Sequence, residues 1–425
     1  MKKDKFLVSI VVPLQQHSYK TAEALINNNR LGSYYTTVYN DEKGIYKILK
    51  ILLSQDLVTR MKGKKSTAIT PFVDKYCELF GLIYLAMVRC KALGKVRYHY
   101  QDFLCRMFAN KVSKKIILGN SDIIIGYDTL SLECFKKLDK IKNRPIKVLD
   151  MASIAAPTIR EIVIRETLKN NYMDNSLEYF KDVYSIDRCK KFEQEIRLAD
   201  YYLVASSFAS KSLVDLGVDR NKIYYLPLGV DVNKYTCKKE PNQDDNQTLK
   251  FLFVGRVEVA KGIYYLLEAF YQLRHLNIHL DVVGEIKCSL QSLEKYKENV
   301  SFQGCIRKEE MPDIYKGADV YILSSLWEGF SLSLFEALST GLPVIASKFS
   351  CAPDVITENE EGFIVDPTNI DDLKSKIVWF NQNRKKIPNM SLKAADLAQT
   401  FSWDSYNKRL VDIMDNIIQQ EVKRN

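Results

Sequence analysis

The chain has 425 residues, of which 46% are hydrophobic and 27% charged, with 17 glycines and 11 prolines. This length accommodates two domains of ordinary size, and the composition excludes a disordered chain. The nine cysteines form no repeated close pair, as is usual for reduced thiols, and no apolar run reaches the ~18 residues of a membrane span. We therefore expect a globular, cytoplasmic protein.

The net charge of +10 is unevenly distributed. Residues 1–150 hold 27 Lys and Arg against 13 Asp and Glu, or +14, whereas residues 151–425 hold 35 against 39, or −4. This basic part indicates contact with an anionic membrane surface or a phosphate-bearing acceptor, or else it is only a solvated surface. The apolar window Leu79–Val88 lies between the basic patches Lys62–Lys65 and Lys111–Lys115. Core packing is its default interpretation, and a membrane-surface helix is the alternative. Nucleic acid is not expected as a partner, because no helix-turn-helix, zinc or RNA-binding motif accompanies the charge.

Strand-like and helical runs alternate along the first half, which predicts an α/β domain with a parallel sheet. The run from Phe6 is too short for a signal peptide and lacks a cleavage site, so it is predicted as a strand. The predicted strands are Phe6–Pro13, Tyr34–Tyr39, Ile123–Gly126, Ile146–Asp150, Tyr201–Ala205 and Ile223–Leu226. The predicted helices are Tyr19–Asn28, Phe72–Ala92 and Ser176–Ala199.

A polar, aperiodic segment at 237–248 predicts a linker, after which the alternation begins again. The second set of predicted strands is Phe251–Gly255, Leu280–Val283, Val300–Phe302, Val320–Leu323, Pro343–Ala346 and Phe363–Val365, with helices at Ile263–Leu273, Lys308–Lys316 and Trp403–Val422. We therefore predict domains at 1–236 and 249–401, with residues 402–425 forming a helix that packs back on the first domain. The expected fold is two doubly wound, Rossmann-like domains that face each other across a cleft.

The strand at Asp319–Leu323 is followed by a loop that carries Glu328, and a helix start then leads to a second carboxylate, Glu336. Loops at the carboxyl ends of strands in open α/β sheets bind ligands. The free backbone N–H groups at the helix start favour an anion there. Two carboxylates beside an anion site suit a ligand that is part phosphate and part polyhydroxylated sugar, namely a nucleotide-sugar.

The second domain opens with Gly255-Arg256 and, after a short loop, Lys261-Gly262. Both cations follow the same strand and can clamp a diphosphate, the arginine through its planar fork and the lysine as a point charge. The alternative is that the two cations lie in a solvated loop and bind no ligand. For Glu336 the alternative is a capping box, in which Ser333 caps the helix and the carboxylate bonds back to the cap.

The stretch Phe251–Pro367 resembles the nucleotide-sugar-binding domain of retaining glycosyltransferase family 4, which has the GT-B fold. The matching elements are Gly255-Arg256, Lys261-Gly262, the pair Glu328 and Glu336 separated by seven residues, Glu328-Gly-Phe, Glu336-Ala-Leu, Gly341-x-Pro343-Val-Ile-Ala-Ser347, Asp354-Val-Ile and Glu361-Gly362-Phe. Pro227-Leu-Gly229-Val-Asp231 also resembles the end of the family's first domain.

The resemblance implies that Arg256 and Lys261 hold the donor diphosphate, with Gly255 and the backbone of Phe330 to Leu332 beside them. Glu336 would then bind the ribose and Glu328 the transferred sugar. It also implies retention at the anomeric carbon, a UDP- or GDP-sugar donor, and a glycan or lipid-linked acceptor in bacterial surface-polysaccharide assembly. The nucleotide-sugar is a substrate, so no cofactor is expected. Because the chain lacks an Asp-x-Asp element and supplies cations instead, we expect catalysis without a metal.

The first half departs from the family pattern. A Gly-Gly loop is common after the first strand, but this chain has Pro13-Leu14-Gln15-Gln16-His17-Ser18, which resembles a less familiar subgroup with a Gln-His-Ser loop. A His is common after a later strand, where this chain has Gly126-Tyr127-Asp128, and the His that can precede a proline is replaced by Ala156. His17, Tyr127 and Asp128 are therefore the candidates for acceptor contact.

Two other functions fit the same residues. A nucleotide-sugar epimerase of the GT-B fold would cleave the donor without transferring the sugar to an acceptor. A glycosyltransferase-like accessory protein would bind sugar or a partner without turnover, which the missing His favours. The presence of Arg256, Lys261, Glu328 and Glu336 favours an enzyme, because a non-catalytic protein has no physical need for all four.

Overall fold

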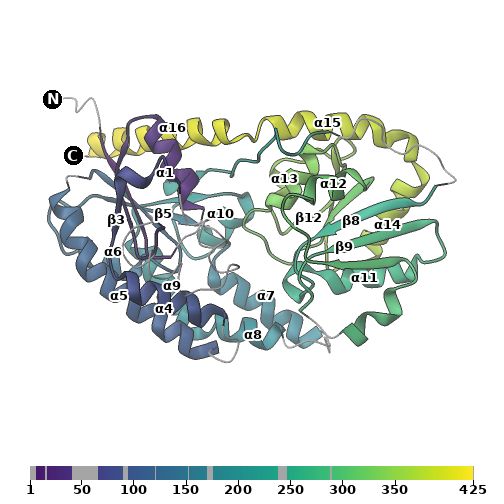
Figure 1. The fold of residues 1–425 in the computed structure, drawn as a ribbon, viewed down its shortest axis with the longest axis horizontal. Coiled ribbons are helices and arrows are strands. Elements are labelled where there is room, and N and C mark those ends of the chain that lie inside the picture. The colour runs from purple at the N-terminus through teal and green to yellow at the C-terminus, as the bar shows by residue number, and fades with distance from the viewer. Residues whose placement is uncertain are drawn as a thin grey trace.

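The structure, a computed structural model, describes residues 6–14, 17–40, 66–89, 94–119, 121–151, 153–169, 176–237, 247–287 and 290–424. Two parallel sheets lie toward the two ends of an elongated molecule (Figure 1), which confirms the predicted α/β class. The first sheet has the order β3-β2-β1-β4-β5-β6-β7 and the second β10-β9-β8-β11-β12-β13. The predicted linker lies largely outside the described residues.

The strands of the first sheet are β1 (Val8–Val12), β2 (Leu31–Thr36), β3 (Val73–Lys75), β4 (Ile123–Tyr127), β5 (Ile146–Met151), β6 (Tyr201–Val204) and β7 (Ile223–Tyr225). The helices around it are α1 (Ser18–Asn27), α4 (Glu78–Arg89), α5 (Gly94–Leu118), α6 (Leu132–Leu138), α7 (Ala156–Lys169), α8 (Ser176–Val183), α9 (Ile186–Leu198) and α10 (Ser207–Val214). Helices cover both faces of this sheet, so its central strands are mostly apolar, and β1 and β4 are buried at every position.

The strands of the second sheet are β8 (Leu249–Val254), β9 (Ile278–Val283), β10 (Val300–Gly304), β11 (Val320–Leu323), β12 (Val344–Ser347) and β13 (Gly362–Val365). The helices that follow the linker are α11 (Ile263–Gln272), α12 (Met311–Lys316), α13 (Leu332–Ser339), α14 (Ile370–Gln382), α15 (Ile387–Gln399) and α16 (Trp403–Arg424). Short 3₁₀ turns are η1 (Thr70–Phe72), η3 (Arg220–Lys222), η4 (Val259–Lys261), η5 (Leu290–Tyr296), η6 (Ala352–Asp354) and η7 (Arg384–Lys386).

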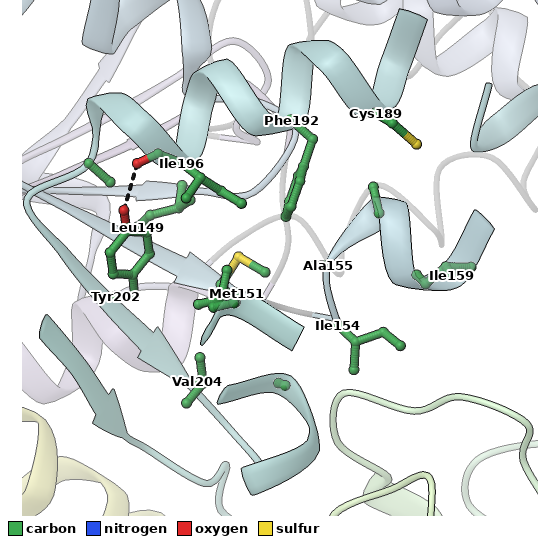
Figure 2. Close-up of a cluster of buried hydrophobic side chains, with 14 of the residues drawn as sticks. Leu149, Met151, Ile154, Ala155, Ile159, Cys189, Phe192, Ile196, Tyr202 and Val204 are labelled. Atoms are coloured by element: carbon green, nitrogen blue, oxygen red, sulfur yellow. Dashed lines mark hydrogen bonds between the residues drawn. The ribbon is translucent and has the colours of Figure 1, made fainter. Parts of the chain in front are cut away.

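One buried cluster fixes the carboxyl ends of β5 and β6 against α9 (Figure 2). Leu149 and Met151 of β5 pack beside Tyr202 of β6, under Phe192 and Ile196 of α9. The Tyr202 hydroxyl donates a 2.6 Å hydrogen bond to the Ile196 carbonyl, so this buried polar atom is satisfied. The loops that follow β5 and β6 therefore start from rigid positions.

The last helix, α16, returns to the first domain and packs on α1 (yellow and purple in Figure 1). Tyr406 is buried, and its hydroxyl lies 2.9 Å from Thr21 Oγ1 of α1. Asp415 accepts a 3.2 Å hydrogen bond from Arg30. Leu410 and Met414, one turn apart, join the core of the first sheet. The helix thus ties the second half of the chain to the first.

Three sequence predictions in the first half are wrong in detail. The single helix predicted at Phe72–Ala92 is instead η1, the strand β3 and α4. Residues Val73–Lys75 become a strand because they pair with Tyr34–Thr36 of β2, a contact that local propensity does not reveal. The predicted helix Ser176–Ala199 is two helices, because Ser185, at the N-cap position of α9, has extended backbone angles. The strand predicted at Tyr34–Tyr39 begins and ends three residues earlier.

In the part of the chain that the structure describes, no helix combines the length and the apolarity needed to span a membrane.

Candidate active site

The loop after β8 presents Arg256 at the carboxyl edge of the second sheet. Its guanidinium lies 2.9 Å from Oε1 of Glu258, whose side chain is only 4% exposed, while the arginine is 51% exposed. A buried carboxylate thus orients a half-exposed cation. Gly284 has a φ of +144°, and a Cβ on it would lie 2.0 Å from the Gly255 carbonyl oxygen. A side chain at Gly284 would therefore displace the loop that carries Arg256.

Lys261 is held by close contact between the β8 and β11 loops. Gly262 has a φ of +62°, and a Cβ on it would come within 1.9 Å of the Ser324 carbonyl oxygen, so only glycine fits. Ser324 Oγ donates a 2.9 Å hydrogen bond to the Lys261 carbonyl, and the Leu326 N–H donates one of the same length to the Ala260 carbonyl. Gly262 is therefore a requirement of this packing, which also fixes the main chain at Lys261.

The structure brings two predicted donor-site residues, Lys261 and Glu328, into direct contact. The ammonium of Lys261 donates a hydrogen bond to Glu328 Oε2, and the two side chains are only 22% and 17% exposed. Ser325 Oγ donates a second hydrogen bond of 3.0 Å to the same oxygen. This pair combines a cation suited to phosphate with a carboxylate suited to sugar hydroxyls.

Glu336 does not form the capping box considered from the sequence. The helix α13 is capped by Ser331, whose Oγ accepts from the Leu334 N–H at 3.4 Å, so the capping-box position is Leu334. The Glu336 carboxylate instead accepts a 2.9 Å hydrogen bond from the buried Tyr315 hydroxyl of α12. Burial raises the pKa of Tyr315 well above its usual value, and the charge and hydrogen bond of Glu336 add to the rise. A buried tyrosine thus orients this half-buried carboxylate.

Phe330, Ser331 and Leu332 are the predicted donor contacts at the start of α13, and their surroundings differ. The Phe330 ring stacks on Phe335 at 4.7 Å, which fixes the loop. Leu332 is 46% exposed at the first turn of the helix. Burial raises the pKa of the Cys351 thiol to about 12, while a backbone hydrogen bond from Ser331 acts in the opposite direction.

In the first domain, His17 forms a pair with Asp150. His17 Nε2 lies 2.9 Å from Asp150 Oδ2, at the carboxyl end of β5, and the carboxylate is only 6% exposed. Burial disfavours the imidazolium, but the charge and hydrogen bond of Asp150 outweigh it, so the pKa of His17 is raised. Asp150 was not predicted as a site residue, although its place at the end of a predicted strand was a usable signal.

The other two acceptor candidates occupy different positions. Tyr127 is fully buried, and its hydroxyl donates a 3.1 Å hydrogen bond to Thr21 Oγ1. Its ring lies edge-on to His17, with centroids 5.2 Å apart. Tyr127 thus packs against His17 from within the core, and an acceptor contact by Tyr127 stays a prediction. Asp128 is 7% exposed and lines a cavity in the first domain.

Contacts between the domains bring these groups near the donor loop. His17 and Asp150 line a small cavity together with Phe330 of the second domain. On α8, the Phe180 ring lies edge-on to Trp327 at 5.3 Å. Tyr179, also on α8, has a lowered pKa. Burial would raise this pKa, but hydrogen bonds from Arg97 and Tyr98 and the positive charge of Arg97 outweigh burial, and the positive charge of Arg256 from the second domain acts in the same direction.

Among the described residues, no three His, Cys, Asp or Glu side chains come together as a candidate metal site. The expectation of metal-independent catalysis is not tested by this finding.

Residues 236–396 match the family model described as "Glycosyl transferases group 1". A curated relative is the UDP-Gal:alpha-D-GlcNAc-diphosphoundecaprenol alpha-1,3-galactosyltransferase of Escherichia coli, 30% identical over 181 residues that make up 39% of this chain and 46% of the relative. The chain spans about half the length of the curated relatives it matches.

Solved structures match almost the whole chain. Sucrose-phosphate synthase from Thermosynechococcus elongatus superposes with a TM-score of 0.65 over 98% of this chain and 100% of its own, at 16% identity. Anabaena Alr3699/HepE in complex with UDP-glucose superposes with a TM-score of 0.59 over 96% and 100%, at 15% identity. At these identities the likeness shows the fold. The chain is a two-domain protein of the GT-B fold, and its second domain matches glycosyl transferases group 1.

Proposed function

We propose that the protein is a glycosyltransferase that moves a sugar from a nucleotide-sugar donor to a hydroxyl group of a glycan or lipid-linked acceptor. The observation that carries the proposal is the contact between Lys261 and Glu328 at the carboxyl edge of the second sheet. A cation suited to phosphate and a carboxylate suited to sugar hydroxyls are adjacent there, within the region that matches the family model. Relatives named for colanic acid biosynthesis and for a cps region support a role in surface-polysaccharide assembly.

In the proposed reaction, the bond between the anomeric carbon and the diphosphate oxygen breaks as the acceptor oxygen bonds to that carbon. The acceptor attacks on the face that the nucleotide leaves, so the configuration is retained. The departing diphosphate takes the acceptor's proton. Negative charge grows on the diphosphate in the transition state, and Arg256 and Lys261 stabilise it as fixed cations. Glu328 binds the hydroxyls of the transferred sugar and Glu336 those of the ribose.

His17 contributes from the acceptor side. Its raised pKa keeps a larger fraction of the imidazole protonated near neutral pH, so it serves as a hydrogen-bond donor rather than a base. Asp150 holds the ring in one orientation through Nε2. The small cavity that His17 shares with Phe330 places it beside the start of α13. A donor at this point stabilises charge on the reacting oxygens.

The experiment is a thermal-shift screen with UDP-, GDP-, ADP- and dTDP-sugars, followed by NMR of donor consumption. We expect one class of donor to raise the melting temperature and to be consumed with the anomeric configuration preserved. A product in which the freed sugar is epimerised and never transferred would favour the epimerase. Stabilisation by a sugar or nucleotide without any turnover would favour the accessory protein.

A further inference from the structure

A cavity of about 440 Å³ lies in the first domain, at the carboxyl ends of β4 and β5. Small-molecule sites typically have volumes of about 300–1,000 Å³. Its walls come from α5, α6 and α9 and from the loops after the two strands, where open α/β sheets bind ligands. Ile154, Ile159 and Phe192, part of the cluster in Figure 2, form an apolar wall. The cavity therefore has the place and size of a ligand site.

The loop that brings Asp128 to this cavity is held by a buried carboxylate. Glu195 of α9 is 1% exposed and accepts hydrogen bonds from the backbone N–H groups of Thr129, Ser131 and Leu132 at 2.6, 2.6 and 2.8 Å. Thr129 has a φ of +66°, a strained value for a β-branched residue. The bonds to Glu195 stabilise this strained conformation, and strain of this kind gathers at functional sites.

Charged side chains of both signs line the cavity in nearly equal number. The cations are Arg106, Arg188 and Lys191, and the carboxylates are Asp102, Asp128 and Glu133. Glu195 also lines the cavity, but burial raises its pKa to about 8, so it adds little negative charge near neutral pH. Lys191 pairs with Asp102 at 2.9 Å. The half-buried guanidinium of Arg188 lies over the Tyr98 ring at 4.3 Å, which fixes its position.

This balance selects the chemistry of the ligand. An anionic ligand would lie against the carboxylates and a cationic one against the arginines, so in either case like charges would meet in a partly buried space. A hydroxyl group both donates to carboxylates and accepts from guanidinium groups. A neutral, polyhydroxylated ligand therefore satisfies the whole lining.

The cavity adjoins the proposed donor site through α8. Tyr184, just beyond the end of this helix, lines the cavity. Phe180, one turn earlier, contacts Trp327, the neighbour of Glu328 in sequence. A ligand in the cavity is thus separated from the donor loop by a single helix end.

We propose that this cavity binds a neutral sugar of the acceptor, with Asp128 and Arg188 bonding its hydroxyls and Glu195 positioning the Asp128 loop. The inference rests on the proposed function and deepens it by naming the acceptor's chemistry. It also separates acceptor recognition from the basic surface of residues 1–150, because the cavity itself carries balanced charge.

The test uses saturation-transfer NMR on the full chain with UDP present. The probes are the methyl glycosides of glucose, galactose, mannose and N-acetylglucosamine, with glucose 6-phosphate and glucosamine as charged comparators. We expect at least one neutral glycoside to bind. Arg188→Gln should weaken its binding at least about tenfold, because a hydrogen bond to a charged group is lost. The matched control is Arg197→Gln on the same helix, where the side chain is 79% exposed, and it should bind as the unmodified protein does.

Three results would overturn the proposal: no neutral glycoside binds, a charged sugar binds better, or Arg188→Gln binds as tightly as Arg197→Gln. If Arg188→Gln does not fold, Asp128→Asn replaces it with the same expectation. Donor consumption is measured separately. Donor turnover without glycoside binding would reject only the cavity, whereas glycoside binding without use of any nucleotide-sugar would reject only the proposed transferase.

Discussion

Replacing Lys261 with alanine tests the donor site most directly. The lysine is 22% exposed and paired with Glu328, so the substitution removes a fixed, partly desolvated cation from the place where charge would develop. Losing one such group costs about 2–4 kcal/mol of transition-state stabilisation. Turnover should therefore fall about 30-fold to about 800-fold. Binding of the nucleoside diphosphate alone should weaken as well.

The ion pair makes a contrasting prediction for Glu328→Gln. Sugar transfer should fall, because the carboxylate that binds the sugar is lost. The nucleoside diphosphate carries no sugar, however, and the neutral amide frees the Lys261 ammonium from its partner. Partly exposed pairs contribute up to about 1 kcal/mol, so UDP or GDP should bind with equal affinity or up to about fivefold more tightly.

The assays are NMR of donor consumption and isothermal titration with UDP and GDP, each preceded by a melting curve. Lys374→Ala is the control, because Lys374 is 28% exposed and pairs with Asp371 at 2.9 Å on α14. If Lys261→Ala retained turnover within threefold of this control, the donor assignment would be wrong. If Glu328→Gln weakened UDP and GDP tenfold, the inferred competition between carboxylate and diphosphate would be wrong.

Four further predictions follow from the same structure. Glu336→Gln should lower donor affinity in titration with little change in melting temperature, because glutamine still accepts from Tyr315; unchanged affinity would remove the ribose role. EDTA should leave activity intact, and a loss that Mg²⁺ restores would show that the cation clamp is misassigned. The pKa of His17 is raised by Asp150, so this pairing stabilises the fold below the unfolded pKa of about 6.5 and is lost as the pH rises through the folded pKa. The melting-temperature gap to Asp150→Asn should therefore shrink as the pH rises above about 6.5. A constant gap would contradict this pairing. Leu79 and Ile83 are 56% and 41% exposed one turn apart on α4, which gives the first domain an apolar face beside its basic surface. Anionic liposomes should therefore bind the protein at low salt and release it at about 0.5 M NaCl. Equal binding to anionic and neutral liposomes would show that the basic surface is only solvated.

Local sequence pattern predicted most of the second domain. Its strands are buried on both faces, so each is a short apolar run that stands out from its surroundings, and the prediction Val320–Leu323 matches β11 residue for residue. Ile263–Leu273 differs from α11 by one residue. The three-residue strand β3 was missed because it exists only through pairing with β2. A segment that short carries too little pattern to be distinguished from the helix that follows.

The sequence by itself also placed Arg256, Lys261, Glu328 and Glu336 at the ends of strands or at a helix start, because these positions follow from local periodicity. It indicated that the β8 and β11 loops share one sheet edge. The contact between Lys261 and Glu328 agrees with that placement.

Only the tertiary structure decided which side chains meet across the first domain. His17 and Asp150 are 133 residues apart, and Glu195 bonds to a loop more than 60 residues earlier in the chain. Neither partner carries a local motif, because Asp150 ends an ordinary buried strand and Glu195 lies within an amphipathic helix. Such pairs depend on strand order and on how a helix packs over the sheet. These are set by burial summed over the whole domain rather than by any one segment.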